Sequence, residues 1–413
     1  MPSSPSPPPS TPQAVRRDFR LLFTGTALNQ AGVTIELGAL PLLAVYVLEA
    51  TPMQVGALYA SGTIAFLIIG LPAGAWVDRA RRRRILQSAG LVHAVLLVSV
   101  PVAAWLDLLT FWHLLVIAAA GGTMTVFFDV AAPAYLPTLV GRGELGRYNA
   151  KIFSVQALAR SSGPALSGAL TQLVGAANAV LMSIGAFLGS SGLISLIRTR
   201  EDRPPREDRH LLKEVWEGIR YVHRDRVLRV TLAAGATFNF FRNIATAVEV
   251  LFLARTLGLD PLGVGLLLSL FGIGGAVGAL TAPLWFRRAG ELRTMWLVLL
   301  TTQPLMALVA VAERDWRMVP LVLGLFGVGY GGQVYNVAQM NLRQQVCEDG
   351  MLGRMNASCR FVTWSVVPLG VLAGGALGEA FGLRTALWVA AVGGMGAALW
   401  PLAARRPATP APV

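Results

Sequence analysis

The sequence predicts an all-α integral membrane protein in which twelve transmembrane helices form two pseudo-symmetric bundles of six. Three observations predict this fold: few charged residues, a repeat at half the chain length, and the placement of the basic residues. Charged residues make up 14% of the 413 residues and apolar residues 54%, whereas about a quarter of an ordinary globular protein is charged. A soluble domain cannot bury so many uncharged segments, because its helices need a polar face.

Twelve segments are long and apolar enough to be considered membrane spans, since a helix crosses the hydrocarbon core with about 20 residues. They are expected at 18–46, 53–77, 85–105, 109–137, 149–172, 176–197, 228–255, 262–286, 294–312, 318–342, 354–378 and 383–404.

The repeat relates the two halves of the chain. The hexapeptide LGRYNA at 145–150 recurs 207 positions later as LGRMNA at 352–357, and glycines at 143, 163 and 168 recur at the same offset. A register held without gaps over about 35 residues indicates an internal duplication. Two hydrophobic halves in parallel repeat are typical of one large group of secondary transporters, with the substrate path between the halves.

The basic residues define an orientation. Of the 35 Lys and Arg residues, 28 fall at the termini and the even-numbered connections, four fall on the opposite side, and three fall within spans. Basic residues are enriched in cytoplasmic loops, so both termini are expected in the cytoplasm, in a multi-pass protein of the cell (inner) membrane. The net charge of +13 is then a topology signal, and we do not expect nucleic-acid binding.

The domain organisation follows from these spans. We expect a disordered cytoplasmic N-terminus at 1–15, a six-helix bundle at 16–198, a cytoplasmic linker at 199–227, a second six-helix bundle at 228–404 and a cytoplasmic tail at 405–413. The basic linker is expected to hold an amphipathic helix near 210–222.

Nothing in the sequence indicates catalysis or a bound cofactor. There is no phosphate-binding P-loop, nucleophile elbow or His-Glu-x-x-His motif. The four histidines are scattered, and the two cysteines, Cys347 and Cys359, lie near the expected cytoplasmic face, where disulfides are rare. We therefore expect no enzyme activity, no cofactor and no metal site.

The connection between the second and third spans, GLPAGAWVDRARRRR at 70–84, carries the most specific motif. It resembles the signature loop of the major facilitator superfamily, in which a glycine (here Gly74) precedes an Asp-Arg pair (here Asp78 and Arg79) and a basic pair. Arg81 replaces a glycine usual just before that pair. Read without the resemblance, the arginines would only hold the loop inside. Small residues let helices approach closely, and a carboxylate at the membrane edge needs a cation or a helix N-terminus.

Further segments resemble the enterobactin-exporter-like branch of that superfamily, which includes drug and macrolide exporters. They lie at 127–131, 135–137, 163–166, 335–337 and 342–344. The resemblance implies proton-driven export of siderophores and other amphipathic compounds. The chain departs from the branch in its first span, where Gly32-Val33 replaces a Gly-Asp pair; Glu36, three residues on, is a candidate for the displaced acidic function, unless that function has been lost.

A second motif, at 163–168 in the fifth span, resembles the antiporter motif of exporters. Gly163, Pro164 and Gly168 match it, while Ser167 replaces a glycine. Proline removes a backbone hydrogen bond and permits a bend, and its small neighbours allow close helix contact. A generic kinked helix is the alternative interpretation.

Polar residues within the spans are the best indicators of a site, because charge at bilayer depth is costly and usually faces a cavity or a partner. Asn29 and Glu36, seven residues apart, share a face of the first span, and Arg242 and Glu249 share a face of the seventh. Seven residues rise about 10.5 Å along a helix, so we do not expect Arg242 and Glu249 to pair with each other.

Glu36 and Glu249 are the candidates for proton coupling, because a poorly hydrated cavity disfavours the charged carboxylate. The alternative is that both lie near the outer interface as solvated or helix-pairing residues. Arg160 and Arg360 could bind an anionic group or neutralise a carboxylate, although Arg360 could instead extend toward lipid headgroups. The other substrate-cavity candidates, which could equally be packing residues, are Asn239, Phe240, Asn336 and Trp364.

The superfamily resemblance also implies a latch at the cytoplasmic face that forms when that face is shut. Carried over, Asp78 faces Arg82 and the start of the eleventh span near Arg354, and Arg82 reaches Asp129. A carboxylate near a helix N-terminus gains roughly 0.3–1 kcal/mol.

These expectations combine into one function. We expect a monomeric transporter that exports a small amphipathic organic molecule, such as a siderophore or an antibiotic-like metabolite, in exchange for protons by alternating access. Its partners are the substrate, protons and the lipid bilayer. An importer or facilitator without proton coupling is the first alternative, and a membrane sensor that transports nothing is the second.

Overall fold

The computed structural model describes residues 12–140, 144–199, 201, 211–315, 318–347 and 351–400, and these residues are helical apart from short connections. The helices of the first half are α1 (Pro12–Tyr46), α2 (Pro52–Ile68), α3 (Gly70–Arg79), α4 (Arg82–Trp105), α5 (Phe111–Val140), α6 (Leu145–Val174) and α7 (Ala176–Ser195). The remaining elements are α8 (Leu211–Arg224), α9 (Arg226–Leu251), the π-helix η2 (Phe252–Thr256), α10 (Pro261–Thr302), the 3-10 helix η3 (Gln303–Leu305), α11 (Met306–Ala310), α12 (Met318–Val346), α13 (Leu352–Phe381), α14 (Leu383–Met395) and the 3-10 helix η4 (Gly396–Ala398).

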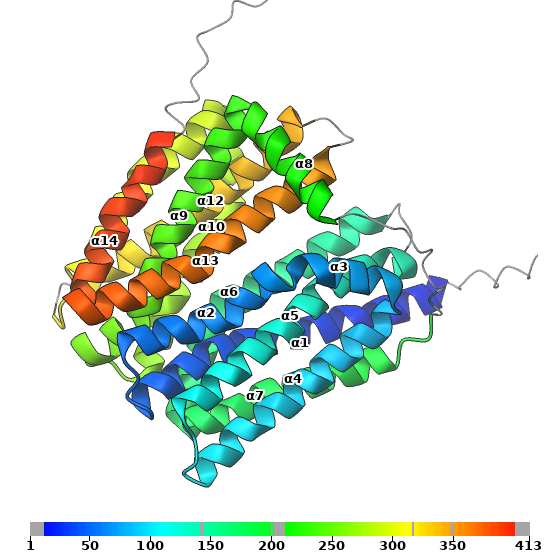
Figure 1. Cartoon of the computed structure of the whole chain (residues 1–413), viewed down its shortest axis with the longest axis horizontal. Coiled ribbons are helices and arrows are strands. Elements are labelled where there is room, and N and C mark those ends of the chain that lie inside the picture. Colours follow the sequence, from blue (N-terminus) through cyan, green and yellow to red (C-terminus); the bar gives the residue numbers. More distant parts are fainter. Residues whose placement is uncertain are drawn as a thin grey trace, which may run out of the picture.

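The helices form two bundles that lie side by side (Figure 1). In the N-terminal bundle, α1 packs on α6 and α7, and α4 packs on α5 and α7. In the C-terminal bundle, α10 packs on α12, and α9 packs on α13 and α14. The bundles meet along two seams, one between α2 and α13 and one between α6 and α10. Helix α8 lies outside the C-terminal bundle against α13 (Figure 1), at the place where the sequence predicts a linker helix.

The two ends of the molecule differ in charge. We call the end where α4, α6 and α13 begin the basic end, because it carries the arginines of residues 81–84. We call the opposite end, where α1 and α13 finish and α2 begins, the far end.

The structure accounts for the twelve expected spans with two differences in how they are built. Seven described helical segments are long and apolar enough to cross a membrane, and Pro52–Ile68 and Leu383–Ala398 are shorter apolar helices. The segment Pro261–Ala310 contains two expected spans, because α10 consists of two helices that meet at Gly290, whose φ of 71° and ψ of 165° are not helical. Helices α6 and α9 supply two further crossings with more polar faces.

The second and first expected spans also differ from the prediction. The second is divided at Ile69 into α2 and α3, with φ and ψ of −104° and −18° at the junction. The first is longer than expected, because α1 begins at Pro12, within the segment 1–15 that was expected to be disordered. Residues 1–11 and 401–413, which hold the rest of the expected tails, lie outside the described residues.

The sequence repeat is matched by the helices it builds. Its two copies open α6 and α13, which are both 30 residues long and contain one internal proline, Pro164 or Pro368. Each helix ends at a glycine in the left-handed region, Gly175 (φ 84°) or Gly382 (φ 88°), and the next helix starts at the following residue. These glycines stand 207 positions apart, so the duplication extends to the helix ends. A residue with a Cβ is strained at such φ values.

The repeated glycines also bring the bundles together. Gly168 of α6 packs against Gly265 of α10, where an added Cβ would lie 3.0 Å from the Gly265 Cα. Its counterpart Gly375 of α13 packs against α2, where an added Cβ would lie 2.8 Å from the Pro52 carbonyl oxygen. Both seams therefore depend on contact between helix backbones near the far end.

Polar contacts close the far end further. The Glu379 carboxylate of α13 accepts hydrogen bonds from the Thr51 hydroxyl (2.8 Å) and the Met53 backbone N–H (3.0 Å) at the start of α2. The Tyr46 hydroxyl at the end of α1 donates to the Leu259 carbonyl of the other bundle at 2.5 Å. In this conformation the far end is shut.

Candidate functional site

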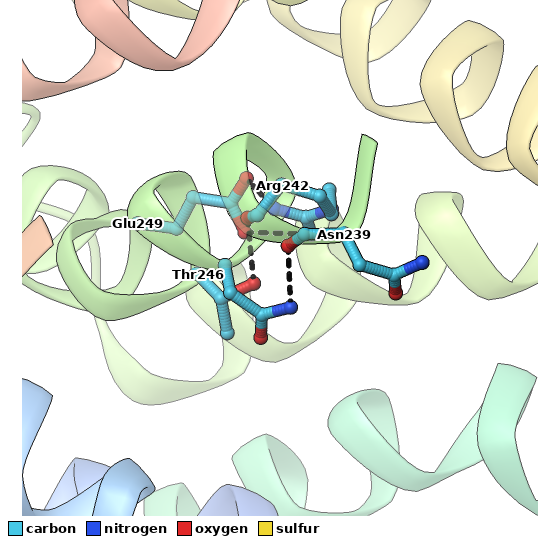
Figure 2. Close-up of polar contacts among 5 residues, drawn as sticks. Asn239, Arg242, Thr246 and Glu249 are labelled. Carbon is cyan, nitrogen blue, oxygen red and sulfur yellow. Dashed lines mark hydrogen bonds and ion pairs between the residues drawn. The ribbon is translucent and has the colours of Figure 1, made fainter. Parts of the chain in front are cut away.

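Arg242 and Glu249 of α9 form a two-pronged ion pair (Figure 2). Arg242 Nη1 lies 2.7 Å from Glu249 Oε1, and Nη2 lies 3.0 Å from Oε2. The expectation that seven residues are too far for a direct contact was wrong. The rise between the two Cα atoms was the wrong measure, because the long side chains reach toward each other along the helix, and a guanidinium matches a carboxylate with two parallel bonds.

The surroundings of this pair keep it in place and away from water. The side chains of Arg242 and Glu249 are 14% and 3% exposed. The guanidinium carbon lies 4.4 Å from the ring centre of Phe271 on α10, a favourable cation–aromatic contact. The Arg242 Nε is buried without a hydrogen-bond partner in the described part of the chain. Arg242 could therefore bind a substrate, and Glu249 a proton, only after the hydrogen bonds between the two side chains break.

The candidates beside this pair are held by their own helix. Asn239 donates from Nδ2 to the Gly235 carbonyl at 2.8 Å and accepts, through its own backbone carbonyl, a 2.7 Å bond from Asn243. Phe240 stacks edge-on against Phe241 with 5.2 Å between ring centres and packs on the core. These contacts make Asn239 and Phe240 packing residues in this conformation.

Glu36 of α1 faces a partner that the sequence analysis did not single out, His93 of α4. His93 Nε2 lies 2.9 Å from Glu36 Oε2, and the residues are 2% and 6% exposed. The imidazole also stacks on Phe187 of α7 with 4.2 Å between ring centres. The Nε2 atom makes no well-directed hydrogen bond among the described atoms, so the two groups are close without good hydrogen-bond angles.

A glycine makes room for this carboxylate–imidazole contact. A Cβ at Gly121 of α5 would lie 2.6 Å from His93 Nε2 and 3.0 Å from Glu36 Oε1. Glu36 is thus enclosed by four helices of one bundle, and the alternative of a solvated residue near the outer interface does not describe it. One signal could have found His93: it is an ionisable residue inside the apolar span 85–105, and such residues are functional candidates by default.

A cavity of about 320 Å³ lies between the bundles toward the basic end. Its walls come from α2, α3, α5 and α13, and they include Asn356, Arg360 and Trp364. The Trp364 ring stacks on Phe66 of the other bundle with 4.4 Å between centres, and the Arg360 guanidinium carbon lies 5.9 Å from the Trp364 ring centre. The structure therefore brings two predicted cavity residues, Arg360 and Trp364, to one wall.

A second cavity, of about 200 Å³, lies deeper between the bundles. Arg160 of α6 lines it together with residues of α1, α2, α9 and α10, among them Thr34, Tyr59 and Val264. Asp129 of α5 lies within electrostatic reach of Arg360 and Arg160.

The antiporter-like motif lies at the seam between α6 and α10. Gly163 packs on Thr34 of α1, and the Pro164 carbonyl lies against Gly265. The Ala165 N–H donates to the Ser269 hydroxyl of α10 at 2.8 Å. Because proline disturbs the hydrogen bonds of its helix, the backbone next to Pro164 is able to make this bond to the other bundle.

The expected latch is described only in part. The side chains of Asp78 and Arg354 lie outside the described residues. Arg82 Nη1 lies 3.7 Å from Glu201 Oε1. An added Cβ at Gly74 would have open space around it, and Arg79 is exposed.

Two remaining candidates do not join the cavity walls described above. Asn29 is buried in α1 at 5% exposure, and Asn336 is exposed on α12. Within the described ranges no group of three or more His, Cys, Asp or Glu side chains gathers where it could hold a metal ion.

Comparison with known proteins places this geometry in a family. The profile of the transmembrane secretion effector family matches residues 11–411. The multidrug efflux pump Tap of Mycolicibacterium fortuitum is 28% identical over 342 residues, which cover 78% of this chain and 80% of that protein. Macrolide efflux protein A of Enterococcus faecalis is 26% identical over 182 residues, 43% of this chain and 56% of that protein. None of these similarities singles out the enterobactin-exporter-like branch.

Solved structures confirm the fold. A bacterial homologue of the iron transporter ferroportin, in an inward-facing state, superposes with a TM-score of 0.75 at 17% identity, covering 94% of this chain and 99% of that one. A bacterial ferroportin homologue in an outward-facing state with soaked iron gives a TM-score of 0.61 at 16% identity, over 94% and 99% of the two chains. The chain is a multi-pass membrane transporter and not an enzyme.

Proposed function

The chain belongs to the transmembrane secretion effector family of major facilitator transporters, and from that premise we propose that it exports a small amphipathic organic compound in exchange for protons. The cargo is siderophore-like or antibiotic-like in size and character. The observation that carries the proposal is that the bundles meet at two seams near the far end, while a cavity lined by Arg360 and Trp364 lies between them toward the basic end. The efflux activity named for two relatives supports the direction of transport.

The proposal fixes an orientation in the membrane. The arginines of the basic end place that end in the cytoplasm under the positive-inside rule, with both termini inside and the protein in the cell (inner) membrane. The two moving bodies are residues 16–198 and 228–404, joined by the linker 199–227, and the working unit is a monomer. Cargo then enters the cavity from the cytoplasm and leaves when the far-end seams open.

The Glu36–His93 pair supports the proton-coupling part of the proposal. Both side chains are buried, and they face each other across α1 and α4. A proton taken up by Glu36 would cancel its attraction to His93, which changes the free energy of the packing between these helices. Glu249 is the weaker candidate, because its two-pronged bond to Arg242 stabilises the carboxylate as an anion.

The latch of Asp78, Arg82, Asp129 and Arg354 belongs to the same proposal. It forms only when the cytoplasmic end is shut, as in the outward-facing state. In the structure Arg82 lies near Glu201.

A flux experiment tests the proposal. A thermal-shift screen with a catecholate siderophore and a macrolide antibiotic identifies a cargo, because a ligand of the folded state raises its melting temperature. Proteoliposomes are then given a pH jump, and we expect the cargo to cross the membrane in the direction opposite to the proton flow. Movement without any effect of the pH jump would instead support a facilitator or importer. Binding without movement in either direction would support a membrane sensor.

A further inference from the structure

The charged residues between the bundles carry a net positive charge. Arg360 lines the cavity toward the basic end and Arg160 lines the deeper cavity, and each is the charged residue among the described lining of its cavity. Asp129 is the carboxylate on which both arginines act. Two positive charges against one negative charge leave an excess of one positive charge.

The three charges follow one another in depth. Arg360 stands eight residues into α13, Asp129 eleven residues before the end of α5, and Arg160 fifteen residues into α6. At 1.5 Å of rise per residue, they lie about 12, 16 and 22 Å from the basic ends of their helices. Counted along the helices, the Cα atom of Asp129 therefore lies at a depth between those of Arg360 and Arg160.

Two other carboxylates of the spans described above already have partners. Glu249 binds Arg242 with both oxygens, and Glu36 contacts His93 inside the N-terminal bundle. A cationic ligand entering between the bundles would meet two arginines and a carboxylate that already has cationic neighbours. An anionic ligand would meet guanidinium groups that present several donors in a plane suited to carboxylate, sulfonate or phosphate oxygens.

The walls indicate what the rest of the ligand is made of. Phe66, Phe361 and Trp364 line the cavity beside Arg360, together with Val126 and Val130. Phe66 and Trp364 stack on each other across the two bundles with an interplanar angle of 27°. A flat apolar ring system can pack on these faces while its charged group reaches the arginine.

We propose that the cargo is an anionic aromatic amphiphile, whose negative group binds Arg360 and then Arg160 and whose ring packs on the Phe66–Trp364 wall. In this arrangement Asp129 competes with the cargo for the arginines. The inference rests on the proposed transport function and specifies the charge of the cargo, which that proposal leaves open.

Two probes that differ only in their charged group test the inference. 1-Pyrenebutyrate is anionic and 1-pyrenebutylamine is cationic, and both carry the same ring and four-carbon chain. Binding to the full chain in nanodiscs is measured by energy transfer from tryptophan to pyrene, with empty nanodiscs to subtract partitioning into lipid. We expect the wild-type protein to bind the anion more tightly than the cation.

Three variants separate charge from shape. Arg360→Gln and Arg160→Gln are each expected to weaken pyrenebutyrate about tenfold, the effect of losing one charge-assisted bond, with little change for pyrenebutylamine. Asp129→Asn is expected to strengthen pyrenebutyrate by about two- to fivefold, because it removes the competitor. Arg384→Gln is the matched control, since Arg384 lies at the far end near Glu313, and it leaves both affinities unchanged.

Several outcomes overturn the inference: equal or tighter binding of the cation, binding of neither probe, weaker anion binding in Asp129→Asn, or an equal loss of both probes in the arginine variants. The transport function is judged separately, by release of pyrenebutyrate from proteoliposomes. Tight, arginine-dependent binding of the anion without any transport would uphold the charge of the site and contradict the export proposal.

Discussion

Glu36 and His93 place a carboxylate and an imidazole 2.9 Å apart among the helices of one bundle. If Glu36 carries the coupling proton, Glu36→Gln should fold and bind cargo normally, because the amide has the same shape, but it should not accumulate cargo across a pH gradient. The measurement is pH-driven flux in proteoliposomes, with binding and thermal unfolding as checks. Glu313→Gln, an exposed far-end residue, is the control.

A Glu36→Gln variant that transports at the wild-type rate would make the residue structural and would turn attention to Glu249 and Asp129. His93→Gln is the complementary variant. It should alter the pH at which coupling is lost, because the partner of the Glu36 carboxylate has been changed without removing the carboxylate itself.

Removing one partner of the Arg242–Glu249 pair is expected to destabilise the protein. Glu249→Leu or Arg242→Met alone should lower the unfolding free energy by about 3–5 kcal/mol, because an unpaired charge stays buried. The double variant Arg242→Met with Glu249→Leu should recover much of the loss. Thermal unfolding of the four proteins forms a double-mutant cycle, and additive losses would contradict the ion pair.

These two pairs show what the residue pattern could and could not predict. The spacing correctly assigned Glu36 and Glu249 to helix faces, since a face depends only on position along one helix. It could not identify the opposing residue, because His93 lies 57 positions away on another helix and its approach depends on how α1 and α4 pack. Within α9 the error was a different one. The prediction considered only the rise between the two Cα atoms along the helix axis and left out the length of the two side chains.

At the scale of elements, helix ends of one bundle are stabilised by the other. Glu379 of α13 accepts from Thr51 and from the Met53 N–H at the start of α2, where the helix dipole favours a negative group. This contact exists only while the far end is shut. Glu379→Ala should therefore favour the outward-open state by roughly 1 kcal/mol, the net value of such a bond.

That shift is measurable as a distance. Spin labels at Leu108→Cys and Phe381→Cys, both exposed at the far end, sit on different bundles and report its opening. Cys347 and Cys359, which are buried, are first replaced by alanine. Glu313→Ala should leave the distribution unchanged, and a Glu379→Ala distribution identical to the parent's would contradict a gating role for Glu379.

The element boundaries were less predictable than the presence of the elements. Long apolar runs predicted the crossings, because hydrocarbon thickness sets their length. The break at Ile69 was not predicted, since it depends on packing that the apolar pattern does not encode. The basic residues around Gly290 indicated a connection between two spans, and the two helices that make up α10 meet at that glycine.

At the scale of the whole molecule, the duplicated glycines determine how closely the bundles can meet. Gly168 and Gly375 occupy matching positions in α6 and α13, and each lies against the backbone of a helix from the other bundle. Alternating access requires these far-end seams to open and close again. Small residues let the backbones of two such helices come into contact. Within the membrane this packing drives helix association, because lipid provides no hydrophobic driving force between helices.

A side chain at Gly375 should therefore act as a wedge. In Gly375→Val the added Cβ would lie 2.8 Å from the Pro52 carbonyl oxygen and 3.0 Å from the Met53 Cα, and backbone atoms cannot move aside as a flexible side chain would. The variant should populate the outward-open state, so the distance between labels at 108 and 381 should lengthen. Labels at Leu196→Cys and Trp216→Cys, exposed at the basic end, should approach each other.

The control is Gly185→Val in α7, where an added Cβ has no atom within 4 Å. It should fold and show the parent's distances, which separates a wedge at the seam from a general cost of valine in a helix. Transport by Gly375→Val should be slow while outward-facing binding is kept, because each cycle must shut the seam once. If its far-end distances match those of Gly185→Val and its turnover is normal, the α2–α13 seam is not the outer gate, and closure at that end must depend on α6 and α10 alone.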